Sequence, residues 1–94
     1  MDPLTEQSVP SLAPGVRMQK DAVSGEPVLV FPEGVLFLNA TAQEIVAKCD
    51  GTHPVSTIIS ELAEEYETAD GDMRNDVLEC LELLHQKKLV RLSE

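Results

Sequence analysis

Apolar and polar residues follow strand-like patterns over the first part of the chain and a helical repeat afterwards. Residues 16–21 alternate between apolar and polar, which is typical of a strand with one solvent-exposed face. Residues 28–31 and 35–38 are apolar throughout, so both faces of these strands are apolar, and three short helices are expected to cover one face of the sheet well and the other poorly. Turns at 24–26 and 32–34 separate the three segments, and such short connections favour an antiparallel meander.

The rest of the chain carries apolar residues at helical spacing. The first helix has two candidate N-caps, Asn39 and Thr41, and Thr41 could form a capping box with Glu44. The last helix has apolar residues on more than one stripe, so we expect it to face two neighbours. The predicted helices run from about 40 to 49, from near 54–56 to 66, and from about 72 to 87.

Strands followed by helices predict a small α+β domain with the helices gathered against the sheet. Its outline is that of a winged helix-turn-helix-like domain: a three-stranded antiparallel sheet followed by three helices. Residues 1–13 contain prolines and lack sustained periodicity, which predicts a flexible N-terminal arm. The domain itself is expected over 14–92, including a short extended tail at 89–92. A chain of 94 residues has room for one such core.

The chain is strongly acidic, with 17 Asp and Glu against 7 Lys and Arg and a net charge of −10. Such a surface repels nucleic acid and anionic membranes. No apolar run approaches the ~18 residues of a membrane span, and the first residues do not resemble a signal peptide. We therefore expect a cytoplasmic protein whose partner is neutral or basic.

The cysteines and histidines do not form a recognisable reactive or metal site. Cys49 and His53, and likewise Cys80 and His85, are spaced unlike the tight pairs of structural zinc sites. Both cysteines lie on apolar helix faces, where a free thiol behaves as a small hydrophobe. A nucleophilic Cys49 would need an oxyanion-stabilising element that the sequence does not indicate. We expect no catalysis, no metal and no cofactor.

The segment Val35–Leu38 is the unguarded edge of the predicted sheet. Charged residues and Pro14 protect the first strand against edge pairing, whereas Val35–Leu38 contains no charge, proline or glycine. A peptide could add there as a further strand, using main-chain hydrogen bonds for affinity and side-chain pockets for specificity. The alternatives are that the tail at 89–92 covers this edge, or that a second copy does so by pairing or by exchanging strands.

A winged helix-turn-helix outline also raises the possibility of DNA binding. The third predicted helix would then enter the major groove, but residues 72–79 carry Asp72, Asp76 and Glu79 against a single Arg74. This charge balance disfavours contact with phosphates.

An ordered series of residues resembles the PqqD family, named for pyrroloquinoline quinone biosynthesis protein D. The resemblance covers about residues 9–92. The series comprises Pro14-Gly15-Val16-Arg17, Leu29, Phe31-Pro32-Glu33-Gly34, Leu38-Asn39-Ala40-Thr41-Ala42, Glu44-Ile45, Cys49-Asp50-Gly51, Ile58, Glu61, Leu62, Tyr66, Asp76-Val77 and Leu81.

The resemblance implies a non-enzymatic recognition element for ribosomally synthesised, modified peptides. It implies a peptide chaperone or adaptor that binds the precursor peptide PqqA by strand addition and presents it to PqqE, a radical S-adenosylmethionine enzyme. It also implies that the peptide lies between the third strand and the third helix. The implied contact residues are Val35, Leu36, Phe37 and Leu38 on the strand, and Met73, Val77, Cys80, Leu81 and Leu84 on the helix.

Three alternatives stay open at this point. Similar domains serve other modified-peptide pathways, a winged-helix protein could bind DNA, and the domain could be either a monomer or a strand-exchanged homodimer.

Overall fold

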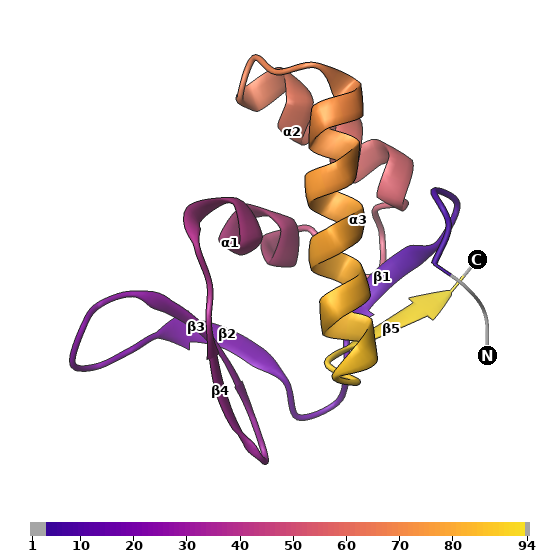
Figure 1. Ribbon diagram of the computed structural model, residues 1–94. Helices are drawn as coiled ribbons and strands as arrows, with labels where there is room; N and C mark the ends of the chain where they lie inside the picture. The colour runs from indigo at the N-terminus through magenta and orange to yellow at the C-terminus, as the bar shows by residue number, and fades with distance from the viewer. Residues whose placement is uncertain (1–3, 94) are drawn as a thin grey trace.

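Two antiparallel sheets and three helices form the structure, a computed structural model that describes residues 4–93 (Figure 1). Strands β2, β3 and β4 form one sheet in that order, and β1 pairs with β5 in the other. The α+β architecture predicted from the sequence is confirmed. The elements are β1 (Val9–Leu12), β2 (Arg17–Lys20), β3 (Pro27–Phe31), β4 (Gly34–Phe37), α1 (Ala40–Ala47), α2 (Val55–Glu65), α3 (Asp70–Gln86) and β5 (Val90–Ser93).

The three-stranded sheet is the predicted meander, with β3 between two edge strands. Its first turn is fixed by Asp21, whose carboxylate accepts hydrogen bonds from the Ser24 N–H at 2.9 Å and the Ser24 hydroxyl at 3.0 Å. Its second turn joins Phe31 to Gly34, which face each other across the ladder. Two residues in the loop set a tight hairpin and therefore one register.

The two faces of this sheet have different surroundings. Leu29 faces its register partners Met18 and Leu36, and all three contact the hydrophobic core. The next residues along each strand point the opposite way because side chains alternate. That outer face carries Val35 and Phe37, which are among the most exposed large hydrophobic side chains. The core thus lies against one face of the sheet, and on the other face the β4 side chains are open to solvent.

The predicted flexible arm at 1–13 is wrong for residues 9–12, which form β1 and pair with β5; residues 1–3 lie outside the described part. The segment before β1 is also bound to the helices. The carbonyl of Ser8 accepts a 2.9 Å hydrogen bond from the Val55 N–H, and the carbonyl of Glu6 accepts one of 2.9 Å from the Ser56 N–H. Since no side chain caps α2, these carbonyls satisfy N–H groups that a helix start leaves unpaired.

The C-terminal tail forms β5 beside β1 and does not cover β4. Figure 1 shows β1 and β5 together on one side of α3, with the three-stranded sheet on the other. Of the possible coverings of the Val35–Leu38 edge, the tail is therefore excluded.

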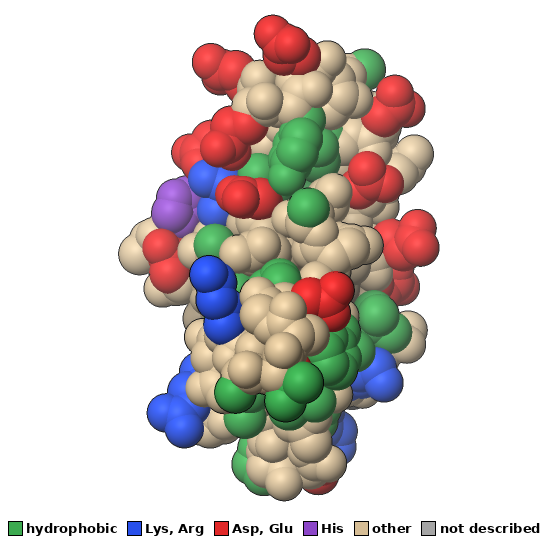
Figure 2. Space-filling model, turned by 90° about the vertical axis from the view of Figure 1, so that its left-hand side faces the viewer, with side chains coloured by type: hydrophobic (Ala, Val, Ile, Leu, Met, Phe, Trp, Pro, Cys, Tyr) green, Lys and Arg blue, Asp and Glu red, His purple; other side chains and the backbone are tan. Residues whose placement is uncertain are grey.

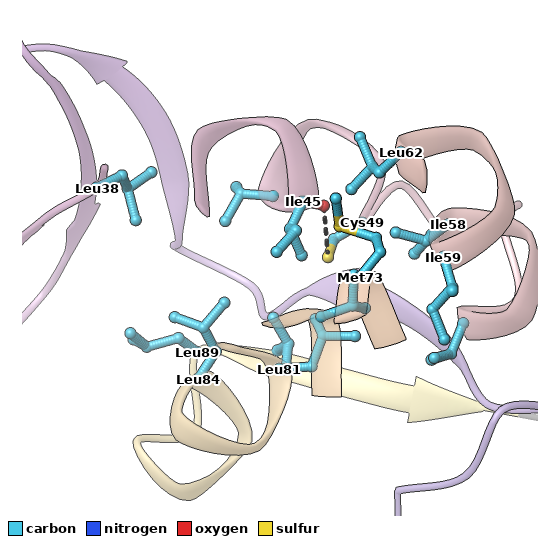
Figure 3. Packing of buried hydrophobic residues seen from close by; sticks show 14 of the residues in the cluster. Leu38, Ile45, Cys49, Ile58, Ile59, Leu62, Met73, Leu81, Leu84 and Leu89 are labelled. Carbon is cyan, nitrogen blue, oxygen red and sulfur yellow. Dashed lines mark hydrogen bonds between the residues drawn. The ribbon is translucent and has the colours of Figure 1, made fainter. Parts of the chain in front are cut away.

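Helix α1 is capped by Asn39, whose side-chain carbonyl accepts a 2.7 Å hydrogen bond from the Ala42 N–H. Thr41, the other candidate, lies inside the helix. The core is formed mainly by side chains of the three helices together with Leu29, Leu38 and the start of β5 (Figure 3). Within residues 4–93, no helix is both long and apolar enough to cross a membrane.

Candidate functional site

A groove of about 490 Å³ lies where β4, the start of α1 and one side of α3 meet. Its lining is mostly apolar side chains, with two carboxylates on α3. The lining residues are Leu36, Phe37 and Leu38 from β4 and the residue after it, Asn39, Thr41, Ala42 and Ile45 from the start of α1, and Asp76, Glu79, Cys80, Leu83 and Leu84 from α3.

Strand β4 forms an open edge along this groove. It pairs with β3 on one side, and no strand among residues 4–93 pairs with the other side. The Leu38 N–H donates a 3.0 Å hydrogen bond to its register partner Pro27. Because hydrogen-bonded and non-bonded pairs alternate along an antiparallel ladder, Leu36 also bonds to β3. The N–H and C=O groups of Val35 and Phe37 therefore point away from β3, towards the open edge.

The side chains of the same two residues are unusually exposed for large hydrophobic groups. Val35 is 54% exposed and Phe37 is 55% exposed, whereas the intervening Leu36 is half-buried against the core. An edge strand with unpaired main-chain groups and exposed apolar side chains is a template for a further strand. The structure shows the open edge that the sequence predicted.

The residues predicted on α3 divide into two groups. Cys80 and Leu84 line the groove, as expected. Met73, Val77 and Leu81 do not: they are 4%, 0% and 0% exposed and pack in the core (Figure 3). These three positions are corrected from groove to core, because the row at 73, 77 and 81 faces the other helices and a bound molecule cannot reach it without opening the core.

Sequence reasoning missed the α3 residues that form the groove side, namely Asp76, Glu79 and Leu83. With Cys80 they occupy positions i, i+3, i+4 and i+7, the spacing of one helix face. Leu83, 47% exposed, was the available signal, because it is an apolar residue outside the core row. The groove residues at the start of α1 were also missed, because no sequence pattern marks the start of a helix as part of a binding groove.

Both thiols are protonated at neutral pH. Burial raises the pKa of Cys80 to about 11, and burial with smaller effects of Cys80 and Asp50 raises that of Cys49 to about 12. The Cys49 thiol donates a 3.3 Å hydrogen bond to the Ile45 carbonyl (Figure 3). The thiols therefore serve as small apolar groups, Cys49 in the core and Cys80 in the groove.

Charge is distributed unevenly over the molecule. Figure 2 shows acidic side chains crowding the helical end of one face, while hydrophobic side chains gather over the sheet end. Asp76 and Glu79 bring this negative charge to the groove itself. No group of three or more His, Cys, Asp or Glu side chains among residues 4–93 is placed to hold a metal ion.

The model of the family described as "Coenzyme PQQ synthesis protein D (PqqD)" matches residues 26–90, which include β4 and α3. This chain belongs to the PqqD family. A "PqqA binding protein" of Xanthomonas euvesicatoria pv. vesicatoria (strain 85-10) is 39% identical over 92 residues, covering 98% of this chain and all of that protein. Its namesake in Xanthomonas axonopodis pv. citri (strain 306) is 38% identical over the same share.

Two solved structures of PqqD proteins share the fold. One is the solution structure of the PqqD part of Methylobacterium extorquens PqqCD, described as a functional, stand-alone recognition element for ribosomally synthesised and modified peptides. It is 30% identical, covers 95% of each chain and has a TM-score of 0.81. The crystal structure of PqqD from Xanthomonas campestris is 35% identical, covers 95% of this chain and 99% of that one, and has a TM-score of 0.60. The family resemblance noted in the sequence is confirmed.

Proposed function

We propose that this PqqD-family chain binds the precursor peptide PqqA and presents it to the radical S-adenosylmethionine enzyme PqqE in pyrroloquinoline quinone biosynthesis. The binding step is supported by the relatives named as PqqA binding proteins, which match over nearly the whole chain. It is also supported by the similarity to a solved peptide-recognition element. In this proposal the domain positions the peptide and performs no chemistry on it.

The observation that carries the proposal is the open edge of β4 beside an apolar groove. The free N–H and C=O groups of Val35 and Phe37 can form a ladder with an extended peptide, as in other complexes formed by strand addition. The apolar groove lining can then receive side chains from the face of the peptide that turns towards α3. Main-chain bonds supply affinity without regard to sequence, and the groove supplies selectivity.

The walls of the groove favour particular peptide side chains. Leu36 and Leu83 offer apolar surface, and Cys80 adds a small uncharged group. Asp76 and Glu79 add negative charge on the α3 side. A segment with apolar groups and no clustered acids suits this lining, because like charges in a partly desolvated site are unfavourable.

The acidic face of α3 disfavours the DNA-binding alternative. In the described chain, Arg74 is the one basic residue of the first three turns of α3, and its guanidinium already contacts the Glu6 carboxylate at 2.9 Å. Asp70, Asp72 and Asp76 are exposed around it. A helix with this charge is poorly suited to enter the major groove of DNA.

The proposal is tested by filling the groove. Ala42 lies in the groove lining and Ala47 lies outside it, on the same helix. With titration of labelled protein by PqqA, we expect Ala42→Phe to weaken binding at least tenfold and Ala47→Phe to leave it unchanged. Equal binding by both variants would contradict the groove as the site.

Adding PqqE should give a ternary complex of the wild type, PqqA and PqqE. If PqqE bound the wild type equally well with and without PqqA, the presentation step would be contradicted.

The same titration tests the other possible occupants of the edge. We propose that PqqA, not a second copy of the chain, occupies β4. A dimer whose mass and hydrogen exchange do not respond to PqqA would instead favour strand exchange between chains. Preference for a precursor peptide of another pathway over PqqA would support the same mechanism in a different pathway.

A further inference from the structure

The outer face of the sheet carries exposed apolar side chains next to the groove. Leu36 lines the groove, and its side chain packs against the core. Val35 does not line the groove, and its side chain is 54% exposed. On β3 and β4, the outer face carries four apolar residues that lie outside the hydrophobic core cluster: Val28, Val30, Val35 and Phe37.

Exposure across this face rises towards the open edge. Val28, in the central strand, is 2% exposed between its register partners Gln19 and Phe37. On β4, Val35 and Phe37 are each more than half exposed. A residue in a central strand is shielded by neighbours on both sides, whereas an edge residue lacks one neighbour. The exposed area is what a further strand beside β4 would cover.

Strand geometry determines which peptide side chains would cover it. The main-chain groups that point to the open edge belong to Val35 and Phe37, and side chains in neighbouring strands continue the same pleat. Whatever the direction of the added strand, alternate side chains therefore lie beside Val35 and Phe37 on the outer face, and the intervening ones point into the groove. Cross-strand neighbours of this kind are close enough to contact each other.

We infer that the site reads its peptide on both faces: Val35, together with the exposed part of Phe37, contacts one row of peptide side chains, and the groove, which Phe37 also borders, contacts the other. The bound segment then carries apolar residues at consecutive positions, and an alternating apolar–polar segment binds poorly. This inference rests on the proposed strand addition and specifies its substrate class. It assigns Val35 to peptide selectivity through its side chain, in addition to the backbone role that any residue at the edge could fill.

The test compares near-isosteric substitutions on the outer face. With PqqA as the ligand, we expect Val35→Thr to raise the Kd at least threefold; Val35 is the outer-face residue of β4 that does not line the groove. Val23→Thr is the matched control, because Val23 is 95% exposed at the tip of the β2–β3 turn, away from β4. It should bind as the wild type does. The thermal midpoints of the free proteins should stay close together, since the replaced side chains are largely exposed.

The outcomes separate this inference from the proposed function. If Val35→Thr binds PqqA as tightly as the wild type, reading by the outer face is overturned while strand addition stands. If the wild type does not bind PqqA, both are overturned.

A complementary measurement does not depend on how the variants fold. Threonine is placed at either the odd or the even positions of the PqqA segment that becomes protected on binding to the wild type. We expect both substituted peptides to bind the wild-type protein more weakly than unsubstituted PqqA does. If only one of the two peptides bound more weakly, a single face of the peptide would be read and the inference would be overturned.

Discussion

Cys80 and Leu81 are adjacent in α3 but face different surroundings: Cys80 lines the groove beside β4, whereas Leu81 is completely buried in the core. One helix thus serves two purposes, with a buried row that holds the domain together and a neighbouring row that forms one wall of the groove. The sequence predicted that this helix would face two neighbours. The structure shows α3 packed against α1, α2 and β5, while the row that contains Cys80 borders the open groove.

The two thiols should respond differently to bound peptide. Because thiolates are the reactive form, a pKa of about 11 makes Cys80 react slowly near neutral pH, at a rate that rises about tenfold per pH unit below that value. Alkylation with iodoacetamide, followed by mass spectrometry at fixed pH, should show Cys80 protected when PqqA is present. Cys49, only 4% exposed in the core, should stay unmodified with or without peptide. Equal labelling of Cys80 in both conditions would contradict its place in the site.

Asn39, not Thr41, should be the residue whose loss weakens α1. Asn39→Ala removes the hydrogen bond to the Ala42 N–H and should lower the free energy of unfolding by about 1 kcal/mol. Thr41→Ala removes no cap and introduces a better helix former, so its effect should stay within about 0.5 kcal/mol. Urea unfolding of both variants measures the difference. A larger loss from Thr41→Ala would mean that Thr41 caps the helix.

The segment before β1 should stabilise the domain. Deleting residues 1–8 removes the carbonyls of Ser8 and Glu6 that accept hydrogen bonds from α2, which should cost about 2 kcal/mol or more in urea unfolding. Glu6→Gln is the control: it removes the charge that faces Arg74 at 2.9 Å but keeps the Glu6 carbonyl. This exposed ion pair should contribute less than about 1 kcal/mol. If the deletion left the free energy of unfolding unchanged, the prediction of a flexible N-terminal arm would be supported instead.

Local sequence patterns predicted the elements whose signals are local. The meander follows from two short turns, and the open edge follows from four residues without a charge, proline or glycine. The pairing of β1 with β5 was not predictable in this way. It joins Val9 to Ser93 across almost the whole chain, and a four-residue strand containing Pro10 has no detectable periodicity.

The candidate site was predicted in part for a related reason. The strand residues were predicted because Val35–Leu38 is a continuous apolar run beside a turn; Leu36, Phe37 and Leu38 line the groove, and Val35 does not. On α3, the sequence predicts Met73, Val77, Cys80, Leu81 and Leu84 as groove residues, but all of these except Cys80 belong to the core cluster. The groove wall on α3 is distinguished from the core by its orientation relative to β4, which depends on packing and not on residue type.

The central claim is that a peptide adds as a strand to β4, and residue-resolved amide hydrogen exchange tests it most directly. The Val35 and Phe37 N–H groups point to the open edge, whereas Leu38 already donates to Pro27 and Leu36 bonds to β3 by the same alternation. Adding PqqA should slow exchange strongly at Val35 and Phe37 and change it little at Leu36 and Leu38. Tight binding of PqqA with no added protection at Val35 and Phe37 would contradict strand addition.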